Sequence, residues 1–279
     1  MGNLLRDTEL TAFGHGQFTI ELHRDWSIWG PVGGYLAAVA IRAASQVSSM
    51  ERPASIHIQF HRTATYSESV VTAQAVARGR QAEAVRVEMT QRGRSIFTAS
   101  LWAIEDNPLA ATRHWSQPPP VPRPDELGRI DEMVEAEGGL VQPIWRSTVE
   151  TRVPDWGGPE RPAGDPYQYG WMRLIDDVAI TDPWISAARL TFASDTIVFP
   201  ALGRGFPIRE TNFIAPTLDL YVAFHQGICD SEWILVEGRG WSANQGLLGG
   251  EATVWSEGGD LVCSSAQQMM VRQSVALPR

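Results

Sequence analysis

Two glycines before an apolar segment are the first residues whose type and spacing could do chemistry. Gly33 and Gly34 directly precede the apolar run 35–44, which we expect to form a helix. The first N–H groups of a helix have no partner inside it, and the helix dipole favours negative charge at that end. The two amides are therefore candidates to stabilise an anion, although close packing of a helix on a sheet would also select glycine. The surrounding residues lack the spacing of a nucleotide-binding glycine loop.

Imidazole and carboxylate groups supply the other candidates. His57 and His61 share one face of an expected strand, but they would lie about 13 Å apart at the usual rise per residue. That separation is too great for one metal ion, so we expect structural roles for both and no metal site. Asp219 interrupts the otherwise apolar strand 217–225. Considered alone, such an aspartate is more often a bulge or edge residue than a catalyst.

Several residue types and motifs are missing, and their absence excludes whole classes of reaction. All 23 basic residues are arginine, because the sequence contains no lysine. A Schiff-base lysine, a Walker A lysine and a biotinylated lysine are therefore excluded. Neither a GxSxG nucleophile elbow nor an HExxH zinc motif occurs, which argues against a serine hydrolase and a zinc protease. The two cysteines, Cys229 and Cys263, are too few for a disulfide framework and are typical of a reducing compartment.

Charge and hydropathy limit the partners. The net charge of -9 would repel a polyanion, and no basic patch offsets it, so we expect no binding to nucleic acid. No apolar run approaches the roughly 18 residues of a membrane helix, and the first residues lack the pattern of a signal peptide. We therefore expect a cytoplasmic protein without a membrane partner.

Proline divides the chain into two folded halves and a connector. Of the 18 prolines, 11 lie between Pro108 and Pro166, including the run Pro118-Pro119-Pro120. Clustered proline is typical of a connecting segment, although residues 126–137 within it favour a helix. We therefore expect an N-terminal domain at 1–104, a proline-rich connector at 105–165 and a C-terminal domain at 166–279.

The two halves show the same order of expected elements. In each, one strand and one helix are followed by four strands at the spacing of hairpins. The first helix, 35–44, is apolar almost all round, which predicts that other structure encloses it. Phe60-His61-Arg62 recurs as Phe224-His225-Gln226, 164 residues later. We interpret the pattern as an internal duplication, with two unrelated α+β domains as the alternative. The expected strands are 18–22, 54–62, 69–78, 82–91 and 95–103, then 167–174, 217–226, 233–241, 247–255 and 261–271, with the second helix at 183–197.

An apolar helix enclosed by an antiparallel sheet, present twice in one chain, resembles the hotdog fold in its double form. The acyl-CoA thioesterase II family is the most similar. Residues 217–225 (TLDLYVAFH) resemble its S-L-D-H-x-x-x-F-H strand, and 232–235 (EWIL) resemble its E-W-L-L strand. Residues 246–251 and 259–272 resemble its G-x-x-x-G-E segment and closing strand. The resemblance covers everything except the connector, and it implies an α+β double hotdog: two tandem antiparallel sheets, each wrapped around a central helix.

The resemblance also implies a catalytic site. Asp219 falls on the family's catalytic aspartate and Gln267 on its glutamine, which together orient a water molecule. Arg239 occupies the position of the family's threonine, and the nearest hydroxyl is that of Ser242, so either residue could take the third position. The amides of Gly33 and Gly34 would polarise the thioester carbonyl. No cofactor or metal is implied.

The function that follows from the resemblance is hydrolysis of the thioester of an acyl-CoA. Two alternatives remain open. A protein of the same fold could bind acyl-CoA or an acyl carrier with little or no turnover, which the arginine at position 239 favours. A hotdog hydratase or dehydratase is less favoured, because the helices show no matching acid–base pair. By analogy with other hotdog proteins, we expect a homo-oligomer.

Overall fold

The computed structural model describes residues 1–107, 109–110, 112–113, 115–155, 161–176, 179–207 and 210–273. The first half contains α1 (Leu4–Asp7), β1 (Thr11–Gly14), β2 (Gln17–Glu21), α2 (Gly33–Ser45), β3 (Arg52–Phe60), β4 (Glu68–Arg78), β5 (Ala82–Gln91) and β6 (Arg94–Ile104). A 3-10 turn (Pro124–Glu126), β7 (Gly128–Arg129), α3 (Ile130–Ala136), α4 (Pro143–Ser147) and β8 (Val149–Val153) follow. The remainder contains β9 (Tyr167–Leu174), α5 (Pro183–Arg204), β10 (Phe213–Ile214), β11 (Thr217–Phe224), β12 (Ile234–Asn244), β13 (Leu247–Ser256), β14 (Leu261–Met270) and β15 (Arg272–Gln273).

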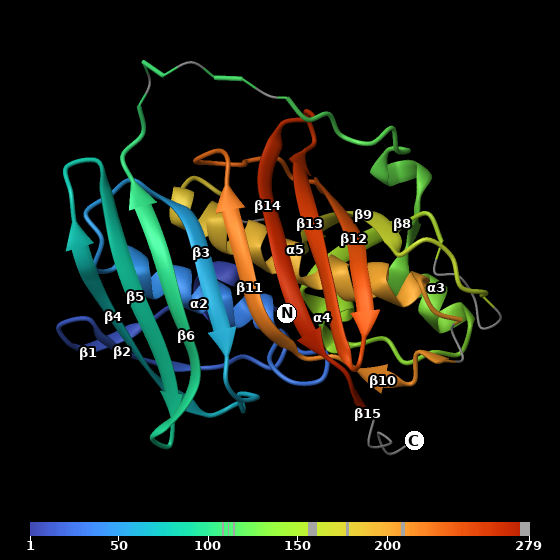
Figure 1. Cartoon of the computed structure of the whole chain (residues 1–279), viewed down its shortest axis with the longest axis horizontal. Helices are drawn as coiled ribbons and strands as arrows, with labels where there is room; N and C mark the ends of the chain where they lie inside the picture. Colours follow the sequence, from blue (N-terminus) through green and yellow to red (C-terminus); the bar gives the residue numbers. More distant parts are fainter. Residues whose placement is uncertain are drawn as a thin grey trace.

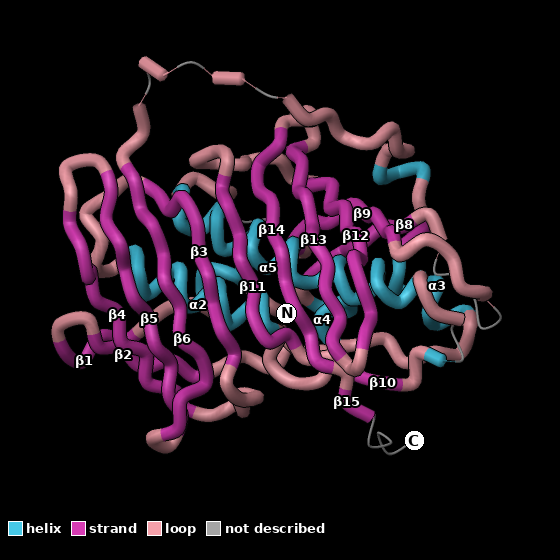
Figure 2. The backbone as a smooth tube through the Cα atoms, viewed as in Figure 1, coloured by secondary structure: helices cyan, strands magenta, loops and turns pink. Residues whose placement is uncertain are grey.

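One antiparallel sheet runs through both halves. Its 13 strands have the order β1-β2-β4-β5-β6-β3-β11-β14-β13-β12-β9-β8-β7, and β10 pairs separately with β15. The two halves meet where β3 pairs with β11, for example at Ile58 and Leu220. Figures 1 and 2 show the central strands of this sheet, from β4 to β12 in the sheet order, in front of the two long helices, α2 and α5. The predicted α+β double hotdog is confirmed, with the difference that pairing of β3 with β11 joins the two expected sheets into one.

Helix α2 is enclosed, as its composition predicts. Ten of its 13 residues are buried, including Tyr35, Leu36 and Ala40. The helix packs on α5 and on the inner face of the first half of the sheet. At Gly34 the two helices approach so closely that a Cβ there would lie 2.7 Å from Phe192 Cα. The expectation that close packing selects glycine therefore holds at this position.

Helix α5 is longer than the sequence indicates. It continues from the expected end at Ile197 to Arg204, past Pro200, although proline removes one hydrogen bond of the helix. Buried apolar residues explain the extension. Val198 packs so closely on Gly250 that a Cβ on the glycine would lie 2.6 Å from Val198 Cγ1, and Leu202 packs on Gly240 in the same way.

The proline-rich connector contributes to the sheet as well as joining the halves. Its strand β8 pairs with β9, and Trp171 Nε1 donates a hydrogen bond to the Pro122 carbonyl over 2.8 Å. Leu127 of the connector packs with three outward-facing apolar side chains of the second half, Trp171, Leu235 and Trp255. This part of the connector therefore covers the outer face of the sheet beside β9 and β12.

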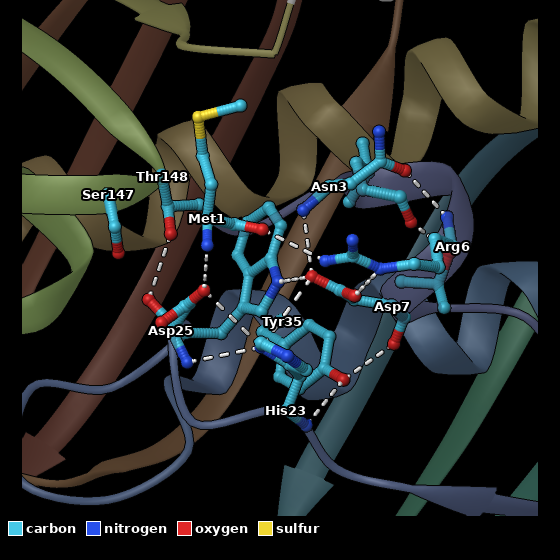
Figure 3. Close-up of polar contacts among 12 residues, drawn as sticks. Met1, Asn3, Arg6, Asp7, His23, Asp25, Tyr35, Ser147 and Thr148 are labelled. Carbon is cyan, nitrogen blue, oxygen red and sulfur yellow. Dashed lines mark hydrogen bonds and ion pairs between the residues drawn. The ribbon is translucent and has the colours of Figure 1, made fainter.

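A buried polar cluster holds the segment that precedes α2 in the sequence against the start of that helix (Figure 3). The Asp7 carboxylate accepts hydrogen bonds from Arg6 Nε at 2.7 Å and Trp26 Nε1 at 2.9 Å, while Tyr35 donates to the Asp7 carbonyl at 2.6 Å. Burial acts to raise the pKa of Asp7, but its hydrogen bonds outweigh burial and lower the pKa overall. The charged carboxylate therefore stabilises the fold at neutral pH, and this contribution is lost when acid protonates it. Trp26 and Tyr35 flank the two glycines at the start of α2, so the cluster holds that end of the helix in place.

We expect Ala40→Asp to prevent soluble folding, because α2 leaves no space or partner for a carboxylate at this fully buried position. Gln46→Asp, at the exposed end of the same helix, should remain soluble and melt close to the wild type. Expression yield and thermal melting of the two variants measure the difference. A soluble Ala40→Asp protein with a normal melting transition would contradict the enclosure of α2.

Candidate active site

A buried carboxylate lies where the two central helices meet. Asp195 projects from α5 toward the first turn of α2, and the residue is only 7% exposed. Its Oδ2 accepts a hydrogen bond of 2.6 Å from the Gly34 N–H, and its Oδ1 accepts one of 3.3 Å from the hydroxyl of Thr217. Two helices and the start of β11 therefore converge on one carboxyl group.

Gln267 joins this group from the adjacent strand β14. Its side chain faces the helices, is 2% exposed, and donates from Nε2 to the Asp195 carbonyl at 3.2 Å. The other end of the amide, Oε1, is buried and has no hydrogen-bond partner among the described residues. A buried acceptor without a partner is costly, so this oxygen is suited to hold a polar molecule that enters the site.

Burial controls the proton affinity of Asp195. It raises the pKa of the carboxyl group to about 6, against the opposing effect of the hydrogen bonds from Gly34 and Thr217. A carboxyl group with this pKa is ionised at neutral pH yet basic enough to accept a proton from a reacting group. The set of carboxylate, hydroxyl and amide could therefore position a water molecule and take its proton.

The glycines predicted from the sequence lie at this carboxylate. The N–H of Gly34 is engaged with Asp195, so in this arrangement it orients the carboxylate and is not free for a substrate carbonyl. Gly33 lies against the same group, since a Cβ built on it would be 3.2 Å from Asp195 Oδ2. Within the described part of the chain, the Gly33 N–H has no hydrogen-bond partner. Of the two predicted amides, only that of Gly33 keeps its capacity to bind an anion.

Gln267 and Asp219 lie on opposite faces of the sheet. Asp219 is paired with Gln268 in the register of β11 and β14, and its side chain is 37% exposed on the outer face. There its Oδ1 accepts a hydrogen bond from the Gln268 N–H, and its Oδ2 lies 3.9 Å from His57 Nε2. Because side chains alternate along a strand, Asp219 and Gln267 cannot orient one water molecule. The predicted pair is therefore corrected: the carboxylate beside Gln267 is that of Asp195.

The two residues considered for the third position are also distant from Gln267. Arg239 is exposed on the outer face of β12, with its guanidinium 5.2 Å from the ring centre of Tyr167. Ser242 is exposed at a bulge farther along β12, opposite Gly249. Strand β12 is two strands from β14, which carries Gln267, and this is about 10 Å at the usual strand spacing. The hydroxyl found beside the carboxylate belongs to Thr217 instead.

Sequence reasoning missed Asp195 and Thr217, although each left a signal. Asp195 is the single charge in the otherwise uncharged segment 190–202, and a lone acid in a buried helix needs a reason. Thr217 opens the strand whose motif drew attention to Asp219. Neither signal shows that a helix residue and a strand residue meet, because that depends on how α5 lies on the sheet.

Two further features of the described residues bear on the site. No three His, Cys, Asp or Glu side chains among them gather closely enough to hold a metal ion. In the same part of the chain, no helix combines the length and the apolar character needed to span a membrane.

Comparison with known families matches both halves of the chain. The acyl-CoA thioesterase N-terminal domain matches residues 22–104, and the acyl-CoA thioesterase C-terminal domain matches residues 116–271. The second match covers more than half of the chain. No curated protein matches the sequence significantly.

Solved structures are similar over nearly the whole chain. An acyl-CoA thioesterase II, TesB2, from Mycobacterium marinum has 19% identity and a TM-score of 0.78, with 98% of this chain and 99% of that chain covered. A protein of unknown function with a hot dog fold, from Alicyclobacillus acidocaldarius, has 21% identity and a TM-score of 0.82, with 98% of each chain covered. The dehydratase domain of PpsC from Mycobacterium tuberculosis has 16% identity and a TM-score of 0.54, with 95% and 96% covered. At these identities the likeness shows the fold alone.

We expect Asp195→Asn to stabilise the protein above pH 6. A pKa raised from 3.8 to about 6 means that the native state loses stability as the pH rises between these values, by about 3 kcal/mol in all. The amide removes this cost, so the variant should gain stability relative to the wild type up to pH 6 and keep a constant advantage above it. Chemical denaturation at pH 4.5, 6 and 8 measures the difference. An advantage that does not grow with pH would contradict the buried ionisable site.

Proposed function

The chain belongs to the acyl-CoA thioesterase family, and we propose that it hydrolyses an acyl-CoA thioester to a free acid and coenzyme A with Asp195, Thr217 and Gln267. The observation that carries the proposal is the hydrogen-bonded Asp195 carboxylate, buried between the two central helices with Thr217 and Gln267 beside it. Hydrolysis of a thioester requires a water molecule in position and a base to take its proton. Gln267 Oε1 can hold the water molecule, and the Asp195 carboxylate can take its proton.

The reaction follows from the hydrogen-bonding capacity of each group. The water donates one hydrogen bond to the Asp195 carboxylate and one to Gln267 Oε1, which leaves a lone pair for the thioester carbon. Asp195 takes the proton as the water oxygen attacks, and the carbonyl oxygen becomes an oxyanion. When the carbon–sulfur bond breaks, the coenzyme A sulfur leaves with the electron pair and receives the proton from Asp195. The products are a carboxylic acid and a free thiol.

The oxyanion requires a hydrogen-bond donor, and we assign this role to the Gly33 N–H. Gly34 cannot supply it while its own N–H is bound to Asp195. A backbone amide at a helix start is well suited to developing negative charge, because the helix dipole favours an anion there. Thr217 donates to Asp195 through its hydroxyl and so keeps one carboxylate oxygen oriented.

A binding protein without turnover receives less support than hydrolysis does. The feature that favoured it was the arginine at position 239, in the place of the family's threonine. Arg239 lies on the outer face of β12, whereas Asp195 lies under the inner face. A hydroxyl is nevertheless present at the buried carboxylate, because Thr217 donates a hydrogen bond to Asp195.

We also propose that the chain forms a homo-oligomer through the outer face of the central strands. Apart from Asp219, the outward-facing side chains in the middle of four neighbouring strands carry no formal charge, and Trp102 and Tyr221 are about half exposed. A depletion of charge with exposed aromatic residues is typical of protein interfaces. The residues concerned are Thr98, Ser100 and Trp102 of β6, Ser55, His57 and Gln59 of β3, Tyr221 and Ala223 of β11, and Ser264 and Ala266 of β14.

We expect Asp195→Asn to lower acyl-CoA hydrolysis by about a thousandfold or more, because it removes the base and leaves the shape of the site intact. Asp219→Asn is the matched control: it makes the same chemical change on the opposite face of the sheet and should retain activity within twofold. Thiol release from acyl-CoA measures both variants. If Asp219→Asn lost activity while Asp195→Asn kept it, the catalytic carboxylate would be that of Asp219.

The pH dependence of turnover tests the ionisation of Asp195. Because the base must be deprotonated, kcat/KM should fall about tenfold per pH unit below pH 6 and should be level between about pH 7 and 8. Steady-state rates at subsaturating acyl-CoA give this profile. A rate that stays level down to pH 4.5 would exclude Asp195 as the base.

A further inference from the structure

Four aromatic side chains gather beside the buried carboxylate. Trp29 and Phe199 meet edge to face with ring centres 4.9 Å apart, and Phe199 meets Phe213 in the same manner at 6.0 Å. Phe206 extends the group through Phe213, with ring centres 5.8 Å apart. We call these residues the aromatic cluster: Trp29, Phe199, Phe206 and Phe213.

The backbone ties the aromatic cluster to the catalytic group at three points. Phe199 lies four residues after Asp195 on α5, which places it one turn further along the same face of the helix, about 6 Å away. Trp29 lies four residues before Gly33, and Phe213 lies four residues before Thr217. Gly33 and Thr217 both contact the Asp195 carboxyl group. Three separate segments therefore bring one ring each to the same side of Asp195.

The aromatic cluster is open to solvent, unlike the core around it. Trp29 is 39% exposed, and the other three rings are partly exposed. Accessible apolar surface beside a buried polar group is typical of a ligand site. The rings offer no polar side-chain atom apart from the Trp29 indole N–H. The amides of a pantetheine arm would lose hydrogen bonds to water there, whereas a hydrocarbon chain would gain contact area.

Other routes away from Asp195 are closed by close packing. Toward α2, a Cβ on Gly34 would lie 2.7 Å from Phe192 Cα. Toward the sheet, Val198 fills the space over Gly250, which is paired with Gln267. Phe60 lies against Gly33, with its Cζ 3.3 Å from the position of a Cβ on that glycine. A chain attached to a carbonyl at Asp195 therefore has no space toward α2 or the sheet.

We propose, on the basis of the hydrolysis proposed above, that the acyl chain of the substrate lies across the aromatic cluster and that Trp29 determines the preference for chain length. The chain runs outward from the carbonyl over Phe199 and Phe213, and Trp29 covers it. The substrate class is a straight-chain acyl-CoA long enough to reach these rings. An acetyl group is too short to contact them.

The test compares the wild type with Trp29→Ala, Trp29→Phe and Trp115→Ala across acetyl-, butyryl-, hexanoyl- and octanoyl-CoA. Trp115 is the control, because it is 90% exposed and lies in the connector. The readout is kcat/KM from thiol release. For the wild type, kcat/KM should rise about three- to fourfold per added methylene, the factor expected for burying one CH₂ group. Trp29→Ala should lower the octanoyl-CoA value at least tenfold and change the acetyl-CoA value less than twofold, with Trp29→Phe between the two and Trp115→Ala like the wild type.

Calorimetry separates this inference from the proposed hydrolysis. Octanoyl-CoA and acetyl-CoA are titrated into Asp195→Asn and into Asp195→Asn with Trp29→Ala. Tighter binding of octanoyl-CoA that disappears with Trp29→Ala supports the aromatic cluster, even if the wild type releases no thiol and the proposed hydrolysis fails. Equal loss for acetyl and octanoyl substrates, or an unchanged chain-length profile in Trp29→Ala, would overturn the inference.

Discussion

The hydrogen bond between the Gly34 N–H and Asp195 is the contact on which the site depends. It forms only because α2 and α5 cross with almost no space between their backbones, which a side chain at position 34 would prevent. The same contact turns the carboxylate toward Thr217 and places α5 above Gln267. The glycine at position 34 therefore determines both how closely the two helices pack and how the candidate catalytic group is oriented.

This arrangement has an energetic cost that a purely structural role would not explain. The protein holds a carboxyl group where burial raises its pKa to about 6, so the ionised form weakens the fold at neutral pH. Asp7 shows the contrasting case, because hydrogen bonds to its buried carboxylate lower its pKa. A group kept in its less stable charged form is typical of a functional site. Asp7 supports the fold, and Asp195 is the better candidate for chemistry.

The two faces of the sheet serve different purposes. Inward side chains of β11 and β14 approach the helices, and Gln267 reaches Asp195 among them. Outward side chains of the same strands, including Asp219, are exposed to solvent. Adjacent residues of one strand therefore belong to different surfaces. This alternation explains why a motif that spans several consecutive positions, such as 217–225, identifies the fold without identifying which of its polar residues is functional.

The sequence by itself determined the order of elements, the enclosure of α2, the family resemblance and the presence of Gln267 and the glycine pair among the candidates. These follow from local signals: alternation, apolar runs and motifs confined to one strand or one turn. Only the tertiary structure decided which carboxylate meets Gln267. Asp219 and Asp195 each stand in an apolar stretch of the sequence, so the sequence alone cannot rank them as catalytic candidates. The choice depends on which face of β11 meets the helices and on how closely α5 packs on Gly240 and Gly250. Gly34 and Asp195 are 161 positions apart, and a contact over such a separation produces no periodic pattern in the sequence from which it could be predicted.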